Sequence, residues 1–243
     1  MIALTLAAWD DAADAACRSA LEELADPGYR AFHSRLVPGI GPFLGVRVPD
    51  LRRMAREIVK GDFCGFLARP AGDLYERKML YGMVLAMAPL PLEERLESLV
   101  RFIPAIDNWA VCDTVAGCCK FAARQPEAVW DFLSPYFAAE ETYPLRFAVV
   151  MLLDYFMTPE FLPRVLEVYG NVRHDNYYVK MAVAWGVSIC FVKDRDRTLA
   201  FLEAGGLPDD FTHNKAIAKA CESLRVSAED KALLRRLRRK QNR

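Results

Sequence analysis

The sequence predicts an all-α protein built as a curved α-solenoid, a stack of antiparallel helix pairs with a concave binding surface. From residue 72 onward, long segments with helical apolar periodicity recur about every 35 residues, the length of a two-helix repeat. Shorter helical segments lie between them. No stretch shows the sustained alternation of apolar and polar residues that marks a half-buried strand. Because stacked helix pairs curve, the first helices of successive pairs are expected to line the concave surface.

Residues 1–71 are expected to form N-terminal capping helices, and residues 72–243 five two-helix repeats of the same single domain, 1–243. The predicted cap consists of an Ala-rich helix over 3–25, a break at Asp26-Pro27-Gly28, a short basic helix over 29–36, a Pro/Gly-rich loop over 37–48, and a helix from Pro49 that Gly61 stops.

The five long helices are predicted at 72–88, 106–124, 143–157, 175–192 and 211–226. Proline is favoured in the first turn of a helix, so three partner helices are expected to begin at Pro91, Pro126 and Pro159, the last capped by Thr158. Ser227, with Asp230 three residues later, resembles a capping box at the start of the final partner helix.

Composition excludes several classes of protein. Of the 243 residues, 53% are hydrophobic, so the chain can bury a large core and is not disordered. No uncharged apolar run reaches the roughly 18 residues that a membrane span needs. Seven scattered cysteines indicate reduced thiols and a cytoplasmic location. Cys112, Cys118 and Cys119 share a predicted helix without a nearby histidine or a CxxC motif, so no metal site and no cofactor are expected.

Charge is balanced overall but unevenly distributed. The formal net charge is zero, which argues against a general nucleic-acid binder. Residues 1–30 are rich in acids, whereas residues 228–243 contain an excess of lysine and arginine. A basic terminal segment is usually a solvated helix face, and it is also a surface on which a phosphate backbone can dock.

The helix predicted over 106–124 carries an unusual face. Trp109 and Asp113 are four residues apart and therefore share one side of a helix. Continued along the helix, that side reaches two cations, Lys120 and Arg124. An aromatic plane, a single carboxylate and two cations suit a polyanion lying along the helix. The same pattern also fits an ordinary helix–helix contact with a solvated aspartate.

Two further features belong to this predicted helix. Asp107 or Asn108 is expected to cap its start, because a short polar side chain accepts hydrogen bonds from first-turn amides. Gly117 is expected in its interior, where glycine costs about 1 kcal/mol relative to alanine. A helix that keeps this glycine is expected to let a large group approach its backbone.

Arg146 is the only charge in an apolar run and therefore needs an anionic partner. Asp113, Asp154 or an external anion can serve, and the sequence leaves these alternatives open. Its position near a helix start is unfavourable for the helix dipole, which favours an external anion.

The last two repeats supply the remaining candidates. Trp185 shares a helix face with Tyr178, and Lys180 lies beside that face; an aromatic pair at this spacing fits either a core or a site. In the final repeat, Lys215 and Lys219 share one face, with Arg225 further along. We expect the cations of this surface to contact phosphates: Lys120, Arg124, Lys180, Lys215, Lys219 and Arg225.

Five segments, in order, resemble the bacterial DNA alkylation repair family, the HEAT-like-repeat alkylpurine DNA glycosylases: GVRVPDLRRMAREI, DNWAVCD, LRFAVVMLL, YYVKMAVAWG and NKAIAKACESLRVS. The resemblance extends from about Tyr29 to about Leu237 and implies a HEAT-like solenoid. In that family a Trp and an Asp one turn apart, an Arg in the next repeat and a second Trp one repeat later form the site. The matching residues are Trp109, Asp113, Arg146 and Trp185.

The resemblance implies hydrolysis of the N-glycosidic bond of cationic alkylated purines, such as 3-methyladenine and 7-methylguanine, in double-stranded DNA. It also implies action without a tight lesion pocket, and we expect a monomer that needs no cofactor. The zero net charge departs from the basic character of family members that process DNA. Two alternatives therefore stay open: a catalytically silent protein that binds DNA structures, and a solenoid scaffold that binds proteins.

Overall fold

A computed structural model describes residues 4–37 and 39–240. No strand occurs in these ranges, which confirms the all-α prediction. The chain divides into two compact units, Met1–Phe121 and Ala122–Arg243. The prediction of one curved repeat array with a single concave surface stays a prediction. Three predicted segments extend beyond the described residues: the first helix at residue 3, the Pro/Gly-rich loop at Pro38 and the basic C-terminal segment at Arg243.

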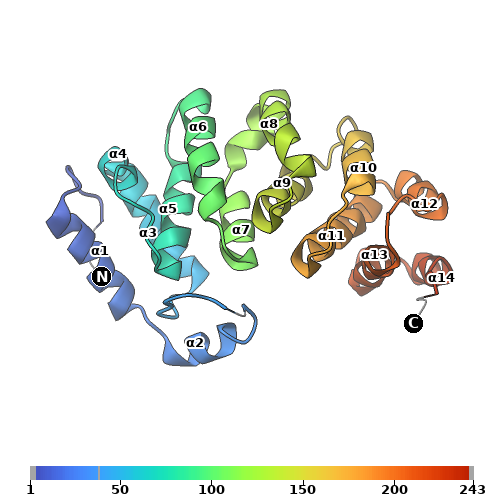
Figure 1. Cartoon of the computed structure of the whole chain (residues 1–243), viewed down its shortest axis with the longest axis horizontal. Coiled ribbons are helices and arrows are strands. Elements are labelled where there is room, and N and C mark those ends of the chain that lie inside the picture. The colour runs from blue at the N-terminus through green and yellow to red at the C-terminus, as the bar shows by residue number, and fades with distance from the viewer. Residues whose placement is uncertain (1–3, 38, 241–243) are drawn as a thin grey trace. The chain divides into compact units, whose positions relative to one another are not determined.

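The first unit is built around α5. Its helices are α1 (Asp11–Glu23), α2 (Pro27–His33), α3 (Val48–Lys60), α4 (Phe63–Leu67), α5 (Tyr75–Met87), α6 (Leu92–Phe102), η1 (Ile103–Ala105) and α7 (Trp109–Ala116) (Figure 1). Helix α5 packs against α3, α4, α6 and α7. Most of its residues are buried, as expected for a helix that is apolar on several sides. At Gly82 an added Cβ would lie 2.4 Å from Val115, so α7 packs closely here.

Two predicted boundaries in the N-terminal cap are corrected. The first helix begins at Asp11, not at residue 3, because Asp10 accepts a hydrogen bond from the Ala13 amide and caps it. The break at residues 26–28 is itself a helix start: Asp26 caps α2, and Pro27 occupies its first position. The stop of α3 at Gly61 is confirmed.

The helix predicted over 106–124 is not continuous. Asn108 caps α7 by accepting from the Val111 amide, so one of the two predicted caps is correct. The helix ends at Ala116, and Gly117 is its C-cap, not an interior residue. The chain then tightens into i→i−3 hydrogen bonds and continues as a 3₁₀ helix, η2 (Lys120–Arg124). Lys120 and Arg124 therefore do not extend the helix face of Trp109 and Asp113.

The second unit is built around α11. Its helices are α8 (Pro126–Leu133), η3 (Ser134–Ala138), α9 (Thr142–Tyr155), α10 (Leu162–Asn171), α11 (Tyr177–Lys193), α12 (Arg195–Glu203), α13 (Asp210–Glu222) and α14 (Ala228–Arg236) (Figure 1). Helix α11 packs against α9, α10, α12 and α13. At Gly186 an added Cβ would lie 2.5 Å from the ring of Tyr169, so α10 packs closely against it.

The predicted starts of the partner helices are partly correct. Pro126 begins α8 and Ser227 caps α14 by accepting from the Asp230 amide, as predicted. Pro91 precedes α6 as its N-cap. Pro159 does not begin a helix: α10 starts at Leu162, and Thr158 accepts from the Phe161 amide in the turn before it.

The seven cysteines all lie within the described residues and none of them forms a disulfide, which agrees with the expected reduced state. Within residues 4–37 and 39–240, no helix is long and apolar enough to cross a membrane.

Candidate functional site

The four residues singled out by the sequence are divided between the two units. Trp109 and Asp113 lie on α7 in the first unit. Arg146 lies on α9 and Trp185 on α11 in the second unit. Trp109, Asp113 and Trp185 are half-buried, whereas Arg146 is buried.

The start of α7 is held from the core helix α5. Lys78, only 8% exposed, places its Nζ 2.5 Å from Asp107 Oδ2. Asp107 Oδ1 in turn accepts a hydrogen bond from the Asn108 side-chain amide at 2.8 Å. Asn108 then caps α7 through the Val111 amide. Trp109 and Asp113, the first and fifth residues of this helix, are thereby placed one turn apart on one side.

The indole of Trp109 contacts α2 and the turn that follows it. Its Nε1 donates to the Leu36 carbonyl at 3.1 Å. Its ring lies 6.2 Å, centroid to centroid, from the ring of His33. His33 is buried and lies between two hydroxyls, with Nε2 3.0 Å from the Tyr75 hydroxyl and Nδ1 3.4 Å from that of Tyr29. Burial lowers the pKa of His33, which favours the neutral ring.

Glu76 secures the loop between α2 and α3. Its carboxylate is completely buried and accepts backbone hydrogen bonds from Leu44, Gly45 and Val46 at 3.0, 2.7 and 3.1 Å. Neither Glu76 nor the role of His33 was predicted from the sequence. The available signals were the pair Tyr29 and His33, four residues apart, and an acid in the first turn of an apolar helix.

In the second unit, Arg146 connects α9 to α11. Its guanidinium donates to the Tyr178 carbonyl in the first turn of α11. A backbone carbonyl is thus one acceptor for this buried cation, and the anionic partner predicted from the sequence stays a prediction.

Trp185 lines a surface cavity of about 250 Å³ between α11 and α13. Ser188, Ile189 and Val192 line it from α11, and Lys219, Glu222 and Ser223 from α13 or just after it. The structure therefore brings Trp185 and Lys219 to one place. The ring of Tyr178, in the first turn of the same helix, lies near that of Tyr143 instead, tilted by 33° with the ring centroids 6.4 Å apart.

The other predicted phosphate contacts differ in their surroundings. Lys215 is exposed, with its Nζ 5.6 Å from the centre of the Phe211 ring. Arg225 is exposed beyond the end of α13. Lys180 is 3.4 Å from Asp175 and 3.8 Å from Asp209, so two carboxylates already offset part of its charge. These contacts make Lys180 less suitable for a phosphate than the exposed Lys215 and Arg225.

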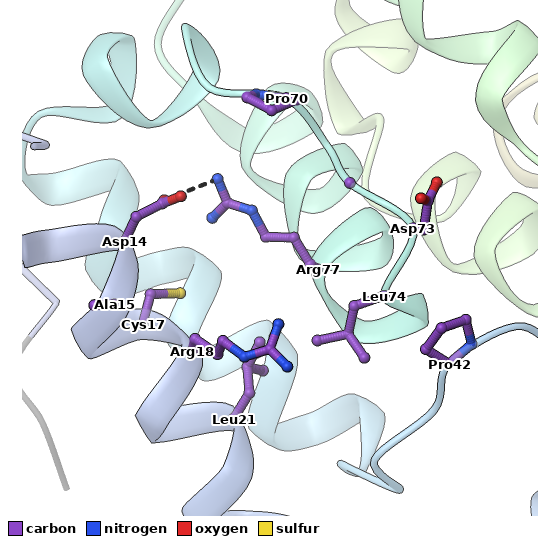
Figure 2. Close-up of a pocket in the computed structure, with 11 residues that line it drawn as sticks. Asp14, Ala15, Cys17, Arg18, Leu21, Pro42, Pro70, Asp73, Leu74 and Arg77 are labelled. Carbon is purple, nitrogen blue, oxygen red and sulfur yellow. Dashed lines mark ion pairs between the residues drawn. The ribbon is translucent and has the colours of Figure 1, made fainter. Parts of the chain in front are cut away.

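A larger cavity, about 530 Å³, lies elsewhere in the first unit, between α1 and the start of α5. Figure 2 shows Asp14 and Arg77 turned toward each other from these helices, and their oxygen and nitrogen are 3.1 Å apart. Burial raises the pKa of Cys17, on the same lining, to about 11, which favours the protonated thiol at neutral pH. None of the predicted site residues lines this cavity.

Across the described part of the chain, no three side chains of His, Cys, Asp or Glu gather where they could hold a metal ion. In the first unit, α7 carries a half-buried indole and a half-buried carboxylate, and in the second unit, α11 carries a half-buried indole and α13 carries Lys215 and Lys219.

No curated protein matches this chain. One protein family, described as DNA alkylation repair enzyme, matches residues 17–229, a span that contains Trp109, Asp113, Arg146 and Trp185. Because the match covers most of the chain, this protein belongs to the family of DNA alkylation repair enzymes.

Proposed function

We propose that this protein is a DNA glycosylase that hydrolyses the N-glycosidic bond of cationic alkylated purines, such as 3-methyladenine and 7-methylguanine, in duplex DNA. Family membership supports a role in alkylation repair. The observation that carries the finer proposal is the pairing on α7 of a half-buried carboxylate, Asp113, with a half-buried indole, Trp109, one turn away. Both side chains keep exposed surface for a ligand.

Asp113 is assigned the electrostatic role. Alkylation makes the base a cation, so it leaves with the bonding electrons as a neutral purine and needs little acid catalysis. Positive charge develops on the deoxyribose as the bond between C1′ and nitrogen breaks. The carboxylate stabilises that charge, orients a water toward C1′ and accepts its proton. The products are the free base and an abasic sugar.

The remaining residues bind and orient the damaged nucleotide. Trp109 and Trp185 present ring surface to the cationic nucleotide, a contact that contributes roughly 0.5–2 kcal/mol each. Arg146, one of whose N–H groups donates to the Tyr178 carbonyl, directs its remaining donors to a phosphate, and Lys215 and Lys219 hold phosphates further along the strand. A cationic lesion is thereby selected electronically, while a neutral base gains little.

The formal net charge of zero favours a second candidate, a protein that binds DNA structures without excising bases. Incubation with duplex DNA that contains 7-methylguanine, followed by measurement of free base, separates the two. Release of 7-methylguanine supports the glycosylase. Binding without release supports the silent binder. A folded protein that neither binds nor cleaves this DNA supports the third alternative, a protein scaffold.

Asp113→Asn is expected to lower the single-turnover excision rate by about 10²–10³ while DNA affinity stays equal or improves. The substitution is nearly isosteric and removes one negative charge that acts on the transition state. If Asp113 serves only to pair with a cation, the variant should instead lose stability and affinity, and activity should fall only in proportion.

Asp131→Asn is the matched control, because Asp131 is exposed on α8 and the change removes the same charge. Excision kinetics at saturating enzyme, affinity and melting temperature are compared for both variants. Near-normal excision by a folded Asp113→Asn protein would remove Asp113 from the mechanism.

Lys215→Gln and Lys219→Gln are each expected to weaken DNA binding regardless of sequence and to reduce the salt slope of log affinity by about one. Lys60→Gln is the control, because Lys60 lies on α3 and already pairs with Glu57 at 2.6 Å. Titrations at several salt concentrations measure the slopes. A slope unchanged by both substitutions on α13 would exclude this helix from the phosphate-binding surface.

A further inference from the structure

The hydrogen-bond donor of Trp109 is used inside the protein. Its Nε1 donates to the carbonyl of Leu36, a residue 73 positions earlier in the chain. An indole has no second donor, so Trp109 cannot donate to a base edge or a phosphate while this bond is intact. Only the ring surface remains for a ligand, and its π face attracts cations.

The carbonyl of Leu36 is itself placed by His33. The chain turns at the end of α2, where the amides of Leu36 and Val37 donate to the His33 carbonyl at 2.9 and 3.1 Å. The imidazole of His33 is anchored to α5 through the Tyr75 hydroxyl at 3.0 Å. One residue therefore connects the core helix to the turn that holds the indole.

The return of the chain toward α3 is anchored to the same helix. Leu44, Gly45 and Val46 donate their amides to the buried carboxylate of Glu76, which follows Tyr75 directly. The ring of Phe43, just before this loop, meets the ring of Tyr75 edge to face at 4.9 Å between centroids. Both ends of the segment from α2 to the loop are thus fastened to the first turn of α5.

We infer that α2, residues 34–37 and residues 43–46 form a clamp that positions Trp109, with His33 as its central positioning residue. The clamp holds the indole through its N–H and leaves the ring as the only recognition surface. In this arrangement Trp109 recognises positive charge on the ligand and not the ligand's hydrogen-bonding groups. Its consequence for excision rests on the proposed function, but the clamp itself does not.

The test uses the full chain labelled with ¹⁵N at its four tryptophan indoles. Trp109→Phe assigns the Trp109 signal. Tyr75→Phe and Tyr81→Phe are a matched pair, since both remove one hydroxyl from α5. The Tyr75 hydroxyl contacts His33, whereas the Tyr81 hydroxyl donates to the Leu67 carbonyl at 3.1 Å. Trp9, whose Nε1 donates to Asp14 at 2.8 Å, is the internal reference.

Tyr75→Phe and His33→Phe are expected to shift the Trp109 indole signal and to speed its hydrogen exchange about tenfold, the factor associated with loss of one hydrogen bond of ordinary strength. Tyr81→Phe should leave that signal unchanged, and the Trp9 signal should stay constant throughout. His33→Gln, whose amide can bond to both hydroxyls, should restore the signal in part. An unchanged Trp109 signal in folded Tyr75→Phe and His33→Phe proteins overturns the clamp.

Excision provides a separate measurement. His33→Phe is expected to slow single-turnover release of 7-methylguanine about tenfold, with a smaller change in DNA affinity, because a mispositioned ring acts mainly on the transition state. If the wild-type protein releases no base, the proposed function fails while the indole spectra still decide the clamp. If the spectra change but excision by His33→Phe equals that of the wild type, the clamp does not serve catalysis.

Discussion

The two units hold their tryptophans in different ways. Trp109 is the first residue of a helix of 8 residues, and its indole N–H donates a hydrogen bond to the carbonyl of the distant Leu36. Trp185 lies in the middle of a helix of 17 residues that packs against four others. Among the described residues of its own unit, none accepts a hydrogen bond from the Trp185 indole N–H. A short helix does not position a side chain by itself, whereas a long central helix does so through packing.

In each unit, nevertheless, a buried histidine makes a hydrogen bond between a peripheral segment and a helix of the core. In the first unit, His33 fastens α2 to α5. In the second unit, His213 is almost completely buried and lies 2.9 Å from the Leu237 carbonyl. Next to it, Asn214 exchanges two hydrogen bonds, each 2.9 Å, with the backbone of Arg239. The end of α14 supplies the Leu237 carbonyl and thus covers His213.

The largest expected effect comes from the first unit. Glu76→Ala removes the acceptor of three backbone amides in the loop before α3. Because each buried donor left without a partner costs about 1–3 kcal/mol, the free energy of unfolding should fall by about 4 kcal/mol. Urea denaturation measures the loss. Glu203→Ala, at an exposed site on α12, is the control. A loss no larger than that of the control would mean that water replaces the carboxylate.

In the second unit, Asn214→Ala breaks both hydrogen bonds to the Arg239 backbone and should lower the free energy of unfolding by about 2 kcal/mol. Amide exchange of residues 237–239 should accelerate because this segment loses its anchor. The exposed Asn171→Ala, at the end of α10, provides the control. Unaltered exchange at Arg239 would contradict this role of Asn214.

The smallest effect concerns pH. Burial lowers the pKa of both His33 and His213; for His213 the nearby Arg239 also lowers it, while the Leu237 carbonyl and Asp210 raise it. The unfolded chain, with histidine pKa values of about 6.5, therefore binds more protons than the folded chain just below that pH. The stability that depends on the two neutral histidines is fully present above about pH 6.5 and is lost as the pH falls toward the pKa values of the folded protein.

The free energy of unfolding should accordingly decrease between pH 7.5 and 5.5. His33→Phe should flatten this dependence for the first unit only, and His213→Phe for the second. Denaturant titrations at several pH values, read out by hydrogen exchange in each unit, test this assignment. An equal slope in the wild type and in both variants would show that other groups cause the dependence.

Much of the fold could be predicted because its signals are local. Helical periodicity depends on residues three and four positions apart, and caps such as Asn108 and Ser227 act on amides within the next turn. The pair Trp109 and Asp113 was found for the same reason, since its members are four residues apart on one helix.

Only the tertiary structure decided the rest, because the determining contacts are distant in sequence. The end of α7 at Gly117 reflects the tight turn that follows it, not the periodicity, which continues to residue 124. His33 meets Tyr75 42 residues away, and Trp109 meets Leu36 73 residues away. A residue's own sequence neighbours fix its helix and its face, but a buried polar group finds its partner only when the chain has packed around it.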